Sequence, residues 1–108
     1  MRNLEVFRNG IAAGILSEEN QRQYTFTYHD DYFYDPEKPA ISLTIPKTHK
    51  AFNSIYLFPF FFNLLSEGVN RKLQSTLWKI DEGDHFGLLA ATAQHDTIGA
   101  ITLKPLLP

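Results

Sequence analysis

The chain has 108 residues and a net charge of −2, with ten Lys and Arg against twelve Asp and Glu. This length fits a single domain over residues 1–108, and a composition of 44% hydrophobic and 20% charged residues excludes a disordered chain. Because there is no basic excess to attract phosphates, we expect no direct contact with nucleic acid.

Cysteine is absent from the sequence, which excludes a disulfide framework, thiolate catalysis and cysteine-ligated metal sites. The first ten residues lack the apolar segment of a signal peptide. The longest apolar run, residues 55–65, is shorter than the ~20 residues of a membrane span and is interrupted by Pro59. We therefore expect a cytoplasmic protein without a membrane partner.

The first half of the sequence predicts β-strands, because apolar and polar residues alternate. The alternation begins over residues 4–7. The Asn9-Gly10 pair that follows is typical of a two-residue hairpin turn, since both positions accept positive φ. Further strands are expected over residues 11–16, 24–28 and 41–45, the last ended by Pro46. Residues 29–39 contain two prolines and three aspartates and predict a loop.

The second half of the sequence has a helical period. Residues 53–65 predict a short helix that Pro59 delays or kinks. The next two helices are indicated by a stripe of Val69, Leu73, Leu77 and Ile80, and by Phe86, Leu89, Ala90 and Ala93 after the N-cap residue Asp84. A closing strand over residues 98–103, halted by Pro105, is expected to pair with the first hairpin. The order predicts an α+β fold: a small, mainly antiparallel sheet or partial barrel with a cluster of about three helices.

The titratable residues show no catalytic pattern. The four histidines, His29, His49, His85 and His95, lack the spacing of a metal-binding pair, so we expect no metal site. The acidic groups at residues 30–37 and 81–84 are expected to form a solvated loop and a helix cap. Since the sequence also lacks a nucleophile motif and a glycine-rich phosphate loop, we expect neither an enzyme nor a cofactor.

Aromatic residues are concentrated in the middle of the chain, with twelve of fifteen between Tyr24 and Phe62. Alternation explains Tyr24, Phe26 and Tyr28 as one face of a sheet. The dense group over residues 56–62 has two interpretations: a helix buried on most sides, or a patch that faces a partner. Trp78, on the flank of the apolar stripe, is either a binding hot spot or a packing residue.

Several segments resemble the N-terminal subdomain of HipA-type proteins. Residues 61–71, FFNLLSEGVNR, are similar to the Phe-Phe-Asp-Asn-Leu-Leu-Pro-Glu-Gly-x-x-Arg signature of that family, with Ser66 in place of its proline. Residues 84–89 and 95–103 resemble a second signature, in which an Asp-x-Phe-x-Leu-Leu helix precedes Gly-x-Asp-x-x-Gly-Ala. Residues 41–46, ISLTIP, resemble its Leu-Ser-Leu-Ser-Leu-Pro segment.

The resemblance implies a role in a toxin–antitoxin system. HipA proteins are bacterial Ser/Thr kinase toxins whose catalytic residues lie outside this subdomain. A free-standing subdomain resembles the HipS family, the antitoxins of three-component HipBST systems. The implied partners are a HipA-like kinase toxin (HipT), which the antitoxin binds and inhibits, and a HipB-like helix-turn-helix DNA-binding protein in the same complex. The alternative is a non-inhibitory scaffold that helps the kinase fold or bridges it to the HipB-like protein.

The resemblance also suggests which residues contact the kinase. A side chain of the turn at residues 66–71, within the first signature, is expected to obstruct the active site or block its closure, and Trp78 on the following helix is the other candidate. The expected partner-binding residues are Ser66, Glu67, Gly68, Val69, Arg71 and Trp78.

Overall fold

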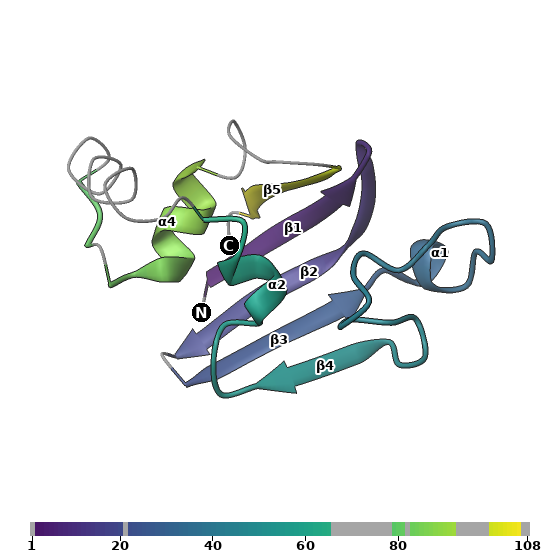
Figure 1. The fold of residues 1–108 in the computed structure, drawn as a ribbon, viewed down its shortest axis with the longest axis horizontal. Coiled ribbons are helices and arrows are strands. Elements are labelled where there is room, and N and C mark those ends of the chain that lie inside the picture. Colours follow the sequence, from purple (N-terminus) through teal and green to yellow (C-terminus); the bar gives the residue numbers. More distant parts are fainter. Residues whose placement is uncertain (1, 21, 66–78, 82, 93–99, 107–108) are drawn as a thin grey trace.

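The computed structural model describes residues 2–20, 22–65, 79–81, 83–92 and 100–106 (Figure 1). These residues form an open, five-stranded antiparallel sheet with three helices. In chain order the elements are β1 (Arg2–Arg8), β2 (Ile11–Asn20), β3 (Gln23–Tyr28), α1 (Asp30–Phe33), β4 (Ala51–Ser54), α2 (Pro59–Phe62), α4 (His85–Thr92) and β5 (Ile101–Leu106). The sheet order is β4-β3-β2-β1-β5. The predicted α+β fold with a mainly antiparallel sheet is confirmed.

The hairpin between β1 and β2 forms where the sequence predicted it. Asn9 and Gly10 have φ angles of 52° and 79°, the left-handed conformation that a tight turn requires. A β-bulge between Val6 and Phe7 then shifts the pairing of β1 with β2 by one residue. Because side chains alternate between faces, this shift determines which residues of β2 share a face with Leu4 and Arg2.

The strand predicted over residues 41–45 is wrong. Only an isolated bridge joins Ser42 and Ile45, and the backbone forms a turn. The hydroxyl of Tyr28 donates a hydrogen bond to the Ile45 carbonyl and accepts one of 3.1 Å from the Ile41 amide. Ile41 and Ile45 are buried, while Leu43 between them is 100% exposed. The alternating pattern therefore arises because Ile41 and Ile45, at the two ends of a turn, are buried, and it does not indicate a strand of the sheet.

The helix predicted over residues 53–65 is also wrong at its beginning. Residues 51–54 form the edge strand β4, which pairs with β3. Helix α2 begins only at Pro59, whose fixed φ and missing N–H suit the first position of a helix, and ends at Phe62. Within the predicted loop, the short helix α1 follows β3 directly.

The closing strand β5 pairs with β1 in antiparallel orientation, as predicted. It continues through Pro105 to Leu106, whereas the sequence predicted an end at residue 103. Proline is tolerated because β5 is an edge strand, where a missing N–H breaks no further ladder bond.

Of the helical stripe predicted over residues 69–80, all but Ile80 lies outside the described residues; Ile80 packs against the core.

The hydrophobic core lies between one face of the sheet and helices α2 and α4, which Figure 1 shows over the sheet. The alternating residues Tyr24, Phe26 and Tyr28 are all buried, which confirms the predicted face of β3. Phe61 of α2 packs against Phe26 with ring centroids 5.8 Å apart. The other buried apolar side chains include Leu4, Val6, Leu16, Phe86, Leu88, Leu89 and Leu103. None of the helices in the described parts of the chain has the length and apolar run that a transmembrane helix requires.

Candidate functional site

A row of three polar side chains, Arg2, Glu18 and Tyr24, crosses the sheet at one end. We call these three residues the charged row. Arg2 of β1 is paired with Glu18 of β2, and Glu18 is paired with Tyr24 of β3. Cross-strand partners project on the same face, so all three side chains point toward the helical layer. Glu18 is only 8% exposed, and it is the only charged residue that is buried in the described part of the chain.

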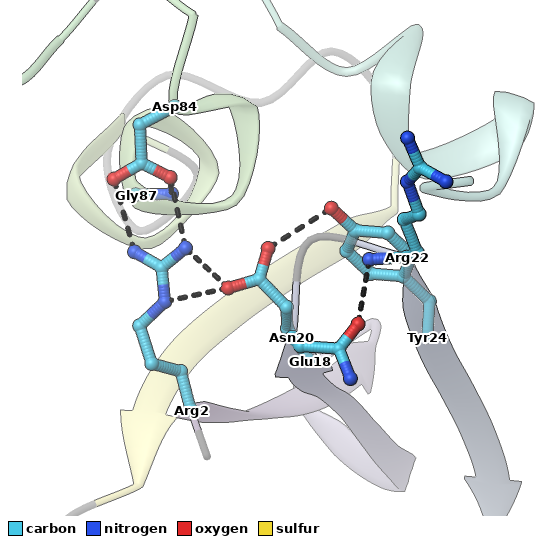
Figure 2. Close-up of polar contacts among 7 residues, drawn as sticks. All are labelled: Arg2, Glu18, Asn20, Arg22, Tyr24, Asp84 and Gly87. Atoms are coloured by element: carbon cyan, nitrogen blue, oxygen red, sulfur yellow. Dashed lines mark hydrogen bonds and ion pairs between the residues drawn. The ribbon is translucent and has the colours of Figure 1, made fainter. Parts of the chain in front are cut away.

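Arg2 joins this row to helix α4 (Figure 2). Its guanidinium donates hydrogen bonds to Oε1 of Glu18, with a distance of 2.9 Å from Nε, and to both carboxylate oxygens of Asp84, at 2.8 and 3.0 Å. The hydroxyl of Tyr24 donates to the other oxygen of Glu18 at 2.9 Å. One arginine thus satisfies two carboxylates from opposite sides of the core. Its guanidinium also lies 5.0 Å from the ring centre of Phe86.

Asp84 is the N-cap residue immediately before helix α4, as the sequence predicted. Its side chain accepts a hydrogen bond of 3.1 Å from the Gly87 amide, and its carbonyl accepts one from Leu88. A β-carbon on Gly87 would lie 2.3 Å from an oxygen of this carboxylate. Glycine at this position therefore leaves the room that Asp84 needs to bond the helix and Arg2 at once.

The ionisation of these groups follows from their contacts. Hydrogen bonds from Arg2 lower the pKa of Asp84 against the opposing effect of burial, and the bond from Gly87 adds to this. Burial, reinforced by the hydrogen bond to Glu18, raises the pKa of Tyr24 to about 12. The hydrogen bond to Asp84 is the largest effect that raises the pKa of Arg2. Near neutral pH the site therefore holds a charged arginine, a charged Asp84 and a neutral tyrosine.

A hollow of about 760 Å³ adjoins the charged row. In the described part of the chain, its walls come from the end of the sheet, the segment before α2, helix α2 and the residues at the start of α4. The described lining residues are Arg2, Glu18, Tyr24, Tyr56, Leu57, Phe62, Asp81, Gly83, Asp84 and His85. Tyr56 is 73% exposed, and Phe62 contacts the ring of His85 edge-on, with centroids 4.9 Å apart.

Neither Asp84 nor Tyr24 is suited to acid–base catalysis near neutral pH. General acid–base work requires a group whose pKa lies near the working pH, but here Arg2 holds Asp84 in its charged form and burial holds Tyr24 neutral. Among the described residues, no group of three His, Cys, Asp or Glu side chains is placed to hold a metal ion. The remaining features of the hollow are shape, aromatic surface and charge.

The residues predicted to contact a kinase lie outside the described part of the chain: Ser66, Glu67, Gly68, Val69, Arg71 and Trp78. Of the predicted acidic groups, Asp84 is the helix cap, and Asp81 bonds the Gly83 amide at 2.7 Å. In the aromatic segment Phe61 is fully buried, as the packing interpretation predicts, whereas Tyr56 is exposed and lies outside the helix α2.

Comparison with known proteins identifies the family. The family model described as "HipA N-terminal domain" matches residues 4–104. The chain belongs to the HipA N-terminal domain family. Among solved structures, one titled "N-terminal domain of HipA toxin" superposes with a TM-score of 0.76 at 30% identity, covering 99% of this chain and 94% of that chain. An uncharacterized protein of Haemophilus influenzae is 32% identical over 104 residues, which cover 96% of this chain and 92% of that protein.

Membership of the HipA N-terminal domain family confirms the resemblance seen in the sequence and the fold that it implied. The charged row of Arg2, Glu18 and Tyr24 was not expected from the sequence. Arg2 and Asp84 lie 82 residues apart, and no local pattern connects them.

Proposed function

We propose that this protein is a HipS-like antitoxin that binds a HipA-like Ser/Thr kinase toxin (HipT) and inhibits it. The observation that supports the proposal most strongly is the likeness to the N-terminal domain of HipA toxin over nearly the whole length of both chains. In HipA this domain is the non-catalytic part of a kinase. A separate chain with the same domain would bind a kinase that lacks it at the surface which the covalent domain occupies in HipA.

Separation of the domain from the kinase changes how the contact is controlled. A covalent domain has a high effective concentration that never changes, whereas a separate chain binds only when its own concentration exceeds the Kd. The Haemophilus relative, 92% of which aligns with this chain, consists of little besides the domain. Depletion of the antitoxin would then release active kinase.

The proposed inhibitory contact is a side chain of the turn expected at residues 66–71, or Trp78. The last described residue before this segment, Leu65, is buried in the core three residues after α2. The proposed action of the contacting side chain is to enter the kinase active site or prevent its closure. The HipB-like DNA-binding protein is proposed to join the same complex.

Co-expression with the HipA-like kinase of the same organism tests the proposal, with growth and co-purification scored together. The expected result is toxicity of the kinase alone, restored growth with the wild-type chain, and a stable complex. Trp78→Ala and Arg71→Ala should reduce the restoration of growth, whereas Leu43→Ala, at an exposed site outside the hollow, should not. A complex without restored growth would indicate the non-inhibitory scaffold instead. Absence of both complex and restored growth would overturn the proposal.

A further inference from the structure

We infer that the hollow at the end of the sheet binds an arginine side chain presented by a protein partner. The identification of that partner as the kinase rests on the proposed function, but the chemistry of the occupant does not. Three properties of the hollow support this occupant: the charge of its described lining, its aromatic walls and its size.

The described residues that line the hollow carry more negative than positive charge. Three of them are carboxylates, Glu18, Asp81 and Asp84, and one is the guanidinium of Arg2. Arg2 is committed to Glu18 and Asp84. Asp81 accepts the Gly83 amide through Oδ1, and no described cation forms an ion pair with it. A cation that enters the hollow would therefore meet a carboxylate that has no charged partner among the described residues, whereas an anion would be repelled by the carboxylates that line it.

The walls favour a flat cation. Tyr56 is 73% exposed at the rim, and the half-buried side chains of Leu57 and Phe62 line the same hollow. A guanidinium stacks on aromatic faces and is weakly hydrated, so it loses less on leaving water than the ammonium of lysine. It can also form two parallel hydrogen bonds with one carboxylate. These properties match a hollow that contains an exposed tyrosine and Asp81, whose carboxylate accepts one hydrogen bond from the described residues, that of the Gly83 amide.

The size of the hollow indicates an arginine within a protein segment. A volume of about 760 Å³ lies in the range of sites that bind drug-sized molecules, so it exceeds what one side chain fills. The residues next to the arginine would occupy the remainder and cover Tyr56. An exposed tyrosine that becomes covered is a common feature of the centre of protein interfaces.

The first test uses the full chain alone with N-acetyl-arginine amide as the probe and N-acetyl-lysine amide as its matched control, followed by NMR. We expect saturable shifts at the amides of Asp81, Gly83 and His85 with the arginine probe and at least threefold weaker binding of the lysine probe. Asp81→Asn should weaken arginine binding about threefold, the range of one exposed ion pair. Asp31→Asn, at an exposed carboxylate on α1, should leave it unchanged. Shifts that do not saturate, or equal binding of the lysine probe, would overturn the inference.

The second test uses the complex with the kinase. Tyr56→Ala should weaken binding about tenfold, the effect of an interface hot spot, whereas Tyr34→Ala should have no effect. These tyrosines are matched, being 73% and 70% exposed. Asp81→Asn should also reduce the sensitivity of the Kd to salt, because salt screens exposed ion pairs. If the wild-type complex forms but Tyr56→Ala behaves like Tyr34→Ala, the inference is wrong and the proposed function stands. If no complex forms, the proposed function fails and the arginine titration alone decides the inference.

Discussion

Arg2 and Asp84 lie 82 residues apart in the chain, yet their side chains form two hydrogen bonds of 2.8 and 3.0 Å (Figure 2). Arg2 is the first residue of β1, and Asp84 is the capping residue immediately before α4. The contact attaches the helix to the end of the sheet and fixes one wall of the hollow. Because the proposed binding site depends on this wall, substitutions in the charged row and at Asp84 test how the helix is held against the sheet.

Replacement of Arg2 by Met should destabilise the protein by about 2 kcal/mol. The substitution leaves the buried carboxylate of Glu18 without a cation, and the cost lies below that of a fully buried pair because Arg2 itself is half exposed. Urea denaturation monitored by circular dichroism measures the change. Arg22→Met is the control, since Arg22 is exposed and outside the row, and it should stay within about 0.5 kcal/mol of wild type. Equal stabilities of the two variants would contradict the arrangement.

Asp84→Asn should remove part of the pH dependence of stability. The pKa of Asp84 is lowered in the folded state, so its carboxylate stabilises the fold above the unfolded pKa of about 3.9. This contribution is lost as the pH falls through the lower, folded pKa. Asparagine still caps a helix, so the variant isolates the charge. It should be about 1 kcal/mol less stable than wild type near neutral pH, a difference that disappears in strong acid. A difference that does not change with pH would be inconsistent with the ion pair.

Tyr24→Phe should destabilise the protein by about 1–2 kcal/mol, because Oε2 of the buried Glu18 loses its donor. Tyr34→Phe makes the same chemical change at an exposed ring and should have almost no effect. Thermal unfolding of the two variants side by side gives the comparison. A similar loss in both would show that the hydroxyl of Tyr24 contributes nothing specific.

Tyr28→Phe should loosen the turn at residues 41–45. The hydroxyl bonds the Ile41 amide and the Ile45 carbonyl, both in the buried interior, and its removal leaves two backbone groups without that partner. We expect a loss of about 2 kcal/mol and faster hydrogen exchange at the Ile41 amide. Unchanged exchange at Ile41, in a variant that remains folded, would argue against this role of the hydroxyl.

The sequence predicted those parts of the fold that have a local cause. The Asn9-Gly10 turn requires positive φ, and the alternation in β3 reflects a sheet with one buried face. The strand predicted over residues 41–45 was wrong, because an alternating pattern indicates which side chains are buried but does not indicate whether the backbone pairs with a neighbouring strand. Strand β4 was missed because Phe52 is the only large apolar residue of that strand.

The contacts of the charged row could not be predicted from the sequence for a different reason. From the hairpin turn alone, regular pairing would place Arg2 opposite Ser17, because Arg8 pairs with Ile11. The bulge between Val6 and Phe7 shifts the register, so that Arg2 lies opposite Glu18. The capping role of Asp84 was evident from the sequence, but its contact with Arg2 requires the complete fold.

The rate of phosphoryl transfer by the purified HipA-like kinase, measured as this chain is added, decides whether the chain is an inhibitor. If the protein is an antitoxin that acts by occupying the kinase, the rate falls in proportion to the amount of complex and is nearly abolished once the chain is equimolar and in excess of the Kd. A rate that remains at the level of the free kinase, in a sample where the complex is shown by size-exclusion chromatography, would show that the chain binds the kinase without inhibiting it.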